Sequence, residues 1–426
     1  MVLTAGSAQT PASATRGVWR VGPVRIRLSI WLPLAIFGLT RLYGFVIIAL
    51  ASRQQVALPS ADHPGIYQFS AHPASPGYLA LITNWDGQWY ERIATLGYHL
   101  PAAGASASAA NDALWTYNFL PGFPMAVGAL MAVTGLSFAV CATVVNLVAG
   151  GAAMVVMFTL VERTAGWFVA GSAVMLTCCF VAAPLFQAAC SESITLLLVC
   201  TVLLLIARRH YAWAVPVVVL MSLTRAVTPP LAIVVLVHAL LRYRNRSKDP
   251  VREGQALWMT VLTLVSALSV LVWPTVTSAI TGSLKSTGTK RSVSNAVVTG
   301  RFGWFTNSYE HIGWIGVAGL ALLVILLVAL ALSPLTRTWG VEVRTWFAIY
   351  PIYLLFVVGV HTGVFRYLLL AFPMALLIVG SPPPGPIPRK RAALVVLVSV
   401  VGLALQIPWV SHALVVTQLA GKPWLP

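Results

Sequence analysis

The sequence predicts an all-α polytopic membrane protein, on two observations. Of its 426 residues, 58% are hydrophobic and only 9% are charged, whereas a soluble domain has roughly 25% charged residues. Apolar stretches of about 20 residues, long enough to cross a bilayer as a helix, recur along the chain. This composition excludes a soluble dinucleotide-binding enzyme, a porin-type barrel and a disordered chain. The net charge of +17 reflects basic residues in short loops, so no nucleic-acid partner is expected.

The apolar stretches define the predicted spans. Residues 1–28 are rich in Ala, Ser and Thr and contain Arg16, Arg20, Arg25 and Arg27, which predicts a disordered cytoplasmic leader. Eleven spans are predicted after it, at 29–51, 138–160, 166–186, 190–207, 211–224, 226–241, 256–280, 311–333, 345–361, 366–380 and 392–410. Residues 29–410 would thus form one transmembrane domain, followed by a tail at 411–426. The short stretch 120–136 contains two prolines and is expected to be interfacial or re-entrant.

Basic clusters predict the orientation of the spans. Placing them in the cytoplasm puts the N-terminus there too, in a multi-pass protein of the cell membrane. The opposite, extracytoplasmic side then receives a long first loop at 52–137, the turn 187–193, Arg225, a second loop at 281–310 and the segment 361–366. The second loop carries Lys285, Lys290, Arg291 and Arg301 against Glu310. Either an anionic ligand such as a lipid phosphate or mere tolerance of a long loop would explain this positive charge.

Cysteine and histidine patterns give little sign of metal chemistry. The five cysteines lie in or beside apolar segments, where small buried side chains are expected. Asp62, His63 and the nearby His72 are possible metal ligands. Exposure to solvent in a polar loop explains these residues more simply. We therefore expect no cofactor and no obligatory metal.

Only ten carboxylates serve the whole chain, and Asp86 is the one best placed for chemistry. Aromatic and aliphatic residues after it predict a short amphipathic helix in the membrane interface, with Asp86 at its N-terminal end. A carboxylate there suits a general base. Capping of the helix is the alternative role, and the two are compatible.

Further ionisable residues interrupt apolar sequence. Glu192 lies between Ser191 and Ser193 at the start of a span, Arg225 breaks the stretch 211–241, and Arg366 follows His361. Arg41 lies inside the first span. Charged groups within a membrane usually mark function, and ion pairs between helices are the competing explanation.

Five motifs in this order resemble those of PIG-V-type mannosyltransferases, related to GPI mannosyltransferase 2. They cover most of the chain, from about residue 30 to 380. The motifs are Trp85–Tyr90 with Ile93-Ala94 and Gly97-Tyr98, Asn118–Pro124, Ser191–Ser193, Leu223–Arg225 and Phe365–Leu368. This chain departs from the family pattern at Ala189-Cys190, where a tyrosine is usual, and at Ala226-Val227, where Pro and Gly are frequent. Those departures concern the acceptor more than the reaction type.

The resemblance implies a GT-C glycosyltransferase fold and transfer of mannose from polyprenyl-phosphate-mannose on the extracytoplasmic side. The acceptor would be a glycolipid or a glycan, and Asp86 the catalytic carboxylate. Substrate contacts are expected from Trp85, Gly87, Trp89, Tyr90, Ser191, Glu192, Arg225, His361, Arg366 and Tyr367. Candidates for the donor phosphate are Arg225, Arg366, Lys285, Lys290, Arg291 and Arg301.

Other functions fit parts of the same sequence. A transporter or flippase for a lipid-linked sugar would also use broken helices and intramembrane arginines. A non-catalytic scaffold would not depend on Asp86, and a prenyl-phosphate arabinosyltransferase would differ in the sugar alone. The carboxylate-bearing first loop favours an enzyme.

Overall fold

Helices dominate the structure, a computed structural model that describes residues 18–21, 24–58, 70–282, 302–382 and 389–417. The described α-helices are α1 Leu28–Ala51, α2 Tyr78–Leu81, α3 Asp86–Leu96, α4 Ala107–Trp115, α5 Gly122–Thr134, α6 Phe138–Ala165, α7 Trp167–Cys178, α8 Glu192–Ala207, α9 Tyr211–Ser222, α10 Pro229–Arg244, α11 Glu253–Leu268, α12 Val272–Thr281, α14 Gly303–Ile312, α15 Trp314–Leu332, α16 Val341–Val357, α17 Val364–Leu368 and α18 Arg389–Trp409. The described 3₁₀ turns are η1 Ser52–Gln54, η2 Thr116–Asn118, η3 Ala183–Gln187, η4 Ser269–Leu271, η6 Pro334–Thr336 and η7 Leu369–Ile378, and η8 Val410–Leu414 is a π turn.

Each predicted span contains helix, which confirms the all-α membrane architecture. Five helical stretches are long and apolar enough to cross a bilayer, namely Leu28–Gln54, Phe138–Ala165, Glu253–Thr281, Trp314–Leu332 and Arg389–Leu414. The helices between them are shorter, and several continue into 3₁₀ turns. The number of crossings and the side on which each loop lies stay predictions.

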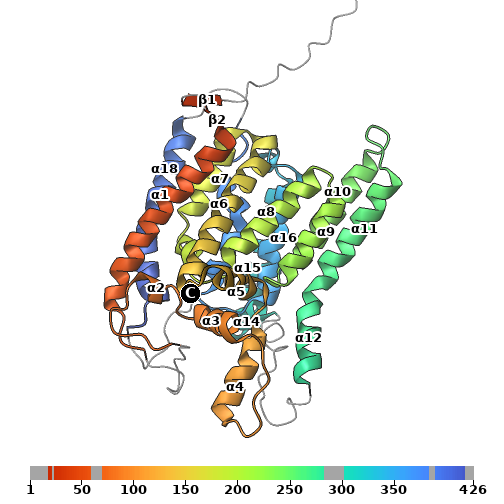
Figure 1. The fold of residues 1–426 in the computed structure, drawn as a ribbon. Helices are drawn as coiled ribbons and strands as arrows, with labels where there is room; N and C mark the ends of the chain where they lie inside the picture. The colour runs from red at the N-terminus through yellow and green to blue at the C-terminus, as the bar shows by residue number, and fades with distance from the viewer. Residues whose placement is uncertain (1–17, 22–23, 59–69, 283–301, 383–388, 418–426) are drawn as a thin grey trace, which may run out of the picture.

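The bundle is built around α6, which packs against α1, α5, α7 and α8 (Figure 1). Met154, Met157 and Phe158 of α6 are fully buried. A side chain at Gly150 would lie 2.6 Å from the ring of Phe37 in α1, so this glycine allows α1 and α6 to approach closely. All five cysteines are free and buried, as expected of small core residues.

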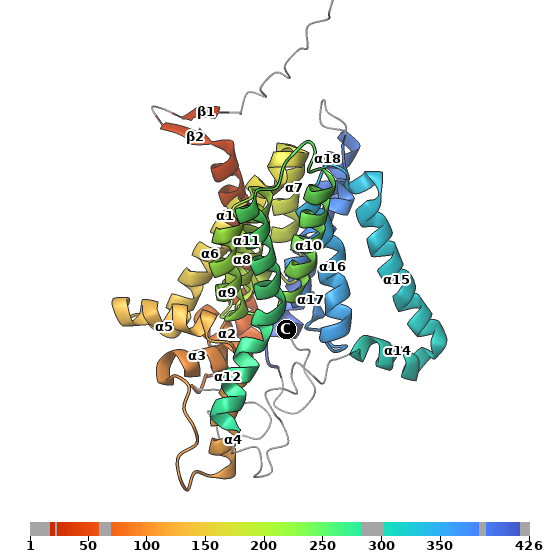
Figure 2. The ribbon, with the colours of Figure 1, turned by 90° about the vertical axis from the view of Figure 1, so that its right-hand side faces the viewer.

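The outer helix α15 supports the membrane assignment. In Figure 2 it stands apart from the bundle, beside α16. Only 6% of the residues in its most apolar stretch of 18 residues are buried. Ile315, Leu322 and Leu332 are among its exposed side chains. A continuous apolar surface of this kind suits lipid and would be costly in water.

Helices α2 to α5 gather with α12 and α14 at the lower end of Figure 1, which we call the α3 end. Figure 2 shows α5 running across the bundle, as expected for an interfacial segment at 120–136. Its thirteen residues end at Gly135, whose φ of 70° and N–H bond to the carbonyl of Met131 close the helix.

Three segments differ from expectation. Within the predicted disordered leader, β1 Val18–Val21 and β2 Val24–Arg27 form an antiparallel hairpin, and residues 1–17 lie outside the described residues. Part of the second loop, Gly303–Ile312, is α14. The predicted tail begins as η8 and continues into buried Val415 and Val416, where the carbonyl of Val416 accepts a bond from Val56 N at 3.1 Å. The apolar character of these tail residues explains their packing.

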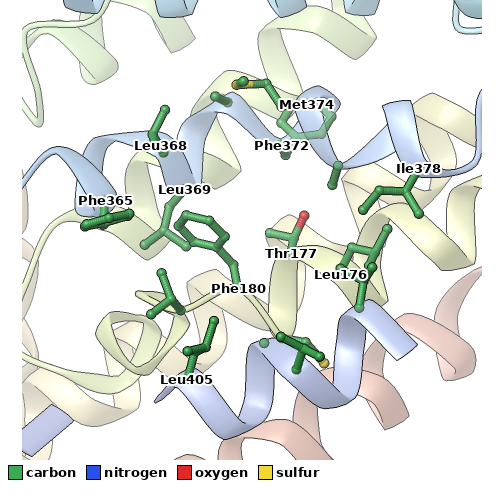
Figure 3. A pocket seen from close by; sticks show the side chains of 17 residues that line it. Leu176, Thr177, Phe180, Phe365, Leu368, Leu369, Phe372, Met374, Ile378 and Leu405 are labelled. Carbon is green, nitrogen blue, oxygen red and sulfur yellow. The ribbon is translucent and has the colours of Figure 1, made fainter. Parts of the chain in front are cut away.

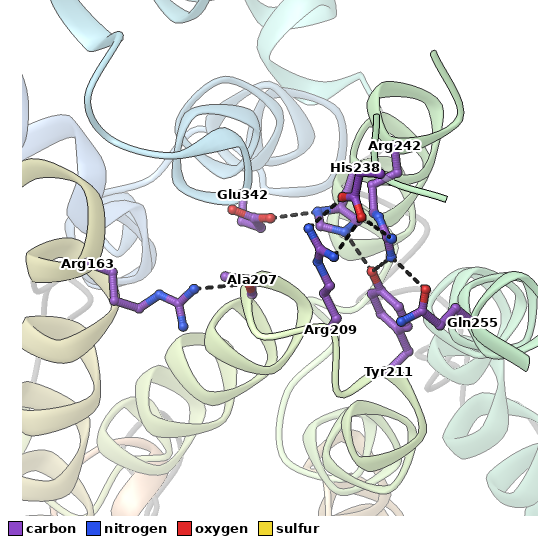
Figure 4. Close-up of polar contacts among 9 residues, drawn as sticks. Arg163, Ala207, Arg209, Tyr211, His238, Arg242, Gln255 and Glu342 are labelled. Carbon is purple, nitrogen blue, oxygen red and sulfur yellow. Dashed lines mark hydrogen bonds and ion pairs between the residues drawn. The ribbon is translucent and has the colours of Figure 1, made fainter. Parts of the chain in front are cut away.

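A second polar cluster lies where α9 begins, α10 ends and α16 begins (Figure 4). Glu342 Oε1 lies 2.6 Å from His238 Nδ1, and the other ring nitrogen of His238 lies 2.9 Å from the hydroxyl of Tyr211. Arg242 donates to Tyr211, and Asp249 pairs with Arg209 at 2.6 Å. The hydrogen bond from Arg209 lowers the pKa of the Asp249 carboxyl. These contacts join α9, α10 and α16 far from the α3 end.

Candidate active site

Four ionisable side chains from separate parts of the sequence meet at the α3 end. Arg366 Nη1 donates to Asp86 Oδ2 at 2.5 Å, and Arg366 Nε donates to Glu192 Oε1. Arg225 Nη1 donates to the same oxygen of Glu192 at 2.5 Å and to Ser191 Oγ at 3.3 Å. Asp86, Arg366, Glu192 and Arg225 therefore form a continuous chain of ion pairs, which we call the ion cluster.

The members of the ion cluster differ in exposure. The side chain of Glu192 is fully buried and those of the two arginines are 9% exposed, whereas the side chain of Asp86 is 31% exposed. Two carboxylates and two guanidiniums balance in charge, which buried ionic groups require. Asp86 is thus the member that solvent or a substrate reaches most easily.

Asp86 lies in a tight turn, residues 84–87, whose backbone is strained at Trp85. Gly87 N donates to Asn84 O at 3.1 Å, and Trp85 between them has φ 61° and ψ −118°. These are the angles of the first central residue of a type II′ turn, a position that normally requires glycine. A tryptophan there costs on the order of 1–3 kcal/mol, a kind of strain that collects at functional sites.

Contacts from distant segments hold this turn in place. The side-chain amide of Asn84 donates to Gln55 Oε1 at 2.6 Å, just after η1, and to the carbonyl of Leu414 in η8 at 2.9 Å. Asn84 and Gln55 are both buried. The orientation of Asp86 therefore depends on segments close to both ends of the described chain.

The N-terminus of α3 packs directly against the segment that leads to Glu192. A side chain at Gly87 would lie 3.2 Å from the methyl group of Ala189, and Ala189 N donates to Ile82 O at 2.9 Å. Asn146 of α6 donates to the carbonyls of Ala188 and Cys190. The pair Ala189-Cys190 is where the sequence departs from the expected motif, and a side chain larger than alanine at residue 189 would push α3 away.

Arg225 lies in the connection between α9 and α10, under the ring of Tyr367. Its guanidinium carbon is 4.6 Å from the ring centroid, a distance suited to cation–π attraction. The carbonyl of Leu223 accepts a bond from Gly122 N at 2.7 Å. The Asn118–Pro124 motif thus supports the backbone that carries Arg225.

Replacing Gly122 by alanine is expected to lower activity by disturbing this connection. The new methyl group would lie 2.9 Å from Leu223 O and 3.0 Å from Thr224 Cα, so the backbone near Arg225 must shift. A displacement of about 1 Å typically costs about 100-fold in rate. Initial rates of the purified variant would measure the loss. Gly38→Ala in α1 is the control, because a methyl group there meets no atom within 4 Å; equal rates for both variants would contradict the expectation.

Most of the predicted substrate-binding residues lie in or beside the ion cluster, namely Trp85, Ser191, Glu192, Arg225, Arg366 and Tyr367. The ring of His361 lies at its rim, 6.2 Å from that of Tyr367.

Tyr90 is predicted to contact the substrate, but its side chain is buried beside the ion cluster. Its ring packs edge-on against Phe119 and Phe123, 5.4 and 5.0 Å away, in a buried hydrophobic cluster. Burial raises the pKa of the Tyr90 phenol, as expected of a hydroxyl in an apolar cluster. Trp89 stacks on Phe119 at 5.9 Å, and Gly87 is buried as a spacer against Ala189. An aromatic side chain in this stretch could pack in the protein interior or stack on a sugar, and the sequence alone does not distinguish these two roles.

Other predicted residues lie apart from the site or outside the described residues. Two sets lie outside the described residues: Lys285, Lys290, Arg291 and Arg301 at 283–301, and Asp62 and His63 at 59–69. Arg41 donates to the carbonyls of Cys178 and Ala183, so this intramembrane arginine satisfies backbone groups at the end of α7. Over the ranges that the structure describes, no group of three or more His, Cys, Asp and Glu side chains could hold a metal.

Three buried polar atoms in or beside the ion cluster lack partners. Within the described part of the chain, Trp85 Nε1, Glu192 Oε2 and Arg225 Nε have no hydrogen bond. Buried donors and acceptors are nearly always satisfied by protein, water or ligand. The cluster therefore has hydrogen-bonding capacity to offer a polar substrate.

An apolar cavity of about 460 Å³ lies between α7, α17–η7 and α18 (Figure 3). Phe365 and Leu368, which flank Arg366 in the sequence, line one part of it, and Phe372, Ala375 and Ile378 continue along η7. Phe365 is 41% exposed and Leu405 is 49% exposed, so the cavity opens toward the lipid-facing surface.

Comparisons with known proteins give limited guidance. No family model and no curated protein matches the chain. Among solved structures, it is similar to the Archaeoglobus fulgidus oligosaccharyltransferase, in a complex with Zn and sulfate, with 13% identity and a TM-score of 0.39. The match covers 86% of this chain and 52% of that one, so the chain spans about half the length of that protein. A TM-score this low carries no argument, and the case for a function rests on the geometry of the site.

Proposed function

We propose that the chain is an integral-membrane glycosyltransferase of the GT-C type. It takes mannose from polyprenyl-phosphate-mannose and transfers it to a glycolipid or glycan acceptor on the extracytoplasmic face. The observation that carries the proposal is the ion cluster, in which the partly exposed carboxylate of Asp86 lies beside two buried guanidiniums at the end of an apolar bundle.

Each part of the cluster suits one part of the reaction. Asp86 accepts the proton of the acceptor hydroxyl as its oxygen attacks the anomeric carbon, and a single displacement inverts that carbon. The bond from the anomeric carbon to the phosphate oxygen breaks, and negative charge grows on the leaving phosphate. Arginine suits this charge, because its planar fork can bind two phosphate oxygens at once. Positioning and electrostatic stabilisation supply most of the rate.

Transfer of labelled mannose from polyprenyl-phosphate-mannose to an extract of native membrane lipids, by the purified protein, tests the proposal. We expect a labelled product, formed also in the presence of EDTA. If the protein formed a labelled product from polyprenyl-phosphate-arabinose and none from polyprenyl-phosphate-mannose, the result would support a prenyl-phosphate arabinosyltransferase. Movement of the donor across liposomes without transfer would support the flippase, and would contradict the proposed reaction.

A lipid-linked donor also needs room for its hydrocarbon chain, and the cavity beside α17 offers apolar space next to Arg366. Ala375→Trp, which fills part of this space, is expected to raise KM about fivefold for long-chain donors and to leave farnesyl-linked donors unchanged, because less apolar surface is buried. Initial rates against donor concentration measure this. Leu322→Trp on the exposed face of α15 is the control, and an equal change for both chain lengths would contradict the assignment.

A further inference from the structure

Arg366 serves two carboxylates through different nitrogens. Its Nη1 group donates to Asp86 and its Nε group to Glu192. The two bonds leave from different positions on the guanidinium, so one can break while the other still orients it. The two carboxylates belong to helices that begin 106 residues apart in the sequence, at 86 and 192.

The two partners are not equally replaceable. Glu192 is fully buried and also holds Arg225, so losing it would leave the buried Arg225 without a carboxylate partner among the described residues and Arg366 with Asp86 alone. Asp86 forms a single ion pair among the described residues, and its side chain is 31% exposed. An anion that approaches from solvent therefore competes with Asp86 for Arg366, and not with Glu192.

Arg225 is less available to such an anion. Its Nη1 group already donates to Glu192 and Ser191, and the ring of Tyr367 covers its guanidinium at 4.6 Å. Its Nε group has no hydrogen bond among the described residues, but that atom is buried and therefore not open to an anion from solvent. Arg366 is thus the cation of the ion cluster whose present partner an entering phosphate can most readily displace.

We propose that the donor phosphate replaces Asp86 on Arg366, while Glu192 keeps the guanidinium in position, and that the carboxylate of Asp86 becomes available as the base only then. This inference rests on the proposed function, since it assigns the order of events at the same site. Glu192 is a positioning residue in this scheme, and Arg366 is the residue that the two anions share.

The exchange fits the charges of the reaction. The ligand-free cluster is neutral, and the phosphodiester donor adds one negative charge that Arg366 binds. During transfer the acceptor proton moves to Asp86, the electron pair of the broken carbon–oxygen bond stays on the phosphate, and Arg366 is already in contact with that phosphate. The donor must also bind before the acceptor hydroxyl can be activated, so hydroxyl groups of other lipids are not deprotonated in its absence.

Binding of farnesyl phosphate to the purified protein, measured by calorimetry in one detergent, tests the exchange without requiring catalysis. If Asp86 competes with the phosphate, Asp86→Asn and Asp86→Ala should bind farnesyl phosphate about tenfold more tightly than the wild type, since a charge-assisted hydrogen bond no longer has to be broken. Arg366→Gln should lose most of the binding. Glu91→Gln, on the same helix, removes a carboxylate that forms no ion pair among the described residues and should change the affinity by less than about twofold.

The outcomes separate this inference from the proposed function. Unchanged or weaker binding by both Asp86 variants, or equal tightening by Glu91→Gln, overturns the exchange, while mannose transfer by the wild type would still support the enzyme. Wild-type binding that does not depend on Arg366 removes the phosphate site itself, and with it both the exchange and the proposed mechanism.

Discussion

Asp86→Asn is expected to lower kcat for mannose transfer by about 10²–10⁴-fold, the usual contribution of a general base. A carboxamide has nearly the same shape as the carboxylate but does not accept the proton of the acceptor hydroxyl. The side chain is partly exposed, so the fold should tolerate the change. The KM for the donor should not rise, because the variant leaves Arg366 free for the phosphate.

Asp249→Asn provides the matched control for this experiment. Asp249 is also an arginine-paired aspartate, 2.6 Å from Arg209, but it lies in the connection between α10 and α11, past the end of α10 that is remote from Arg225. Its variant should transfer mannose at nearly the wild-type rate. Full activity of a folded Asp86→Asn protein would move the base to another carboxylate, with Asp112 and Glu192 the first to be tested, and would remain compatible with a transferase.

Glu192→Ala is expected to lower the free energy of unfolding by about 3–5 kcal/mol, the usual cost of removing one partner of a buried ion pair. The variant leaves Arg225 without a carboxylate partner among the described residues and Arg366 with Asp86 alone. A large loss of stability should therefore accompany any loss of activity. Thermal unfolding of the purified protein in one detergent, at a fixed scan rate, measures the change.

Two comparisons isolate the buried pair. Glu253, like Glu192, is the first residue of an α-helix, but it is exposed, so Glu253→Ala should cost at most about 1 kcal/mol. The double variant Glu192→Leu with Arg225→Met should be more stable than Glu192→Leu alone, because no unpaired cation then remains at position 225. If Glu192→Ala and Glu253→Ala lowered the midpoint equally, Glu192 would not hold the cluster together.

The sequence predicted those features that depend on local pattern. Hydropathy located the long spans, and the amphipathic stretch after Asp86 became α3. The prolines near residue 120 correctly indicated a helix that does not follow the bundle axis (Figure 2). Ionisable residues in apolar sequence correctly drew attention to Glu192, Arg225 and Arg366, since a charge in hydrocarbon requires a partner or a function.

The pairing within the ion cluster could not be read from the sequence, because it depends on long-range packing. Arg366 and Asp86 are 280 residues apart, and nothing local indicates that Arg366 would bridge Asp86 and Glu192. The positive φ of Trp85 was equally hidden, since tryptophan is not a residue that signals a type II′ turn. Arg41 is an intramembrane charge of a different kind, because its guanidinium donates to the backbone carbonyls of Cys178 and Ala183 and lies outside the ion cluster.

The hydrogen bond from Asn84 to the carbonyl of Leu414 joins residues 330 positions apart. During synthesis at the ribosome, the turn that carries Asp86 is made long before the residue that holds it in place. Residue 414 must be translated and packed before this turn acquires its final support. The geometry of the turn that carries Asp86 is therefore completed late in folding, after the helices that lie between residues 84 and 414 have been made.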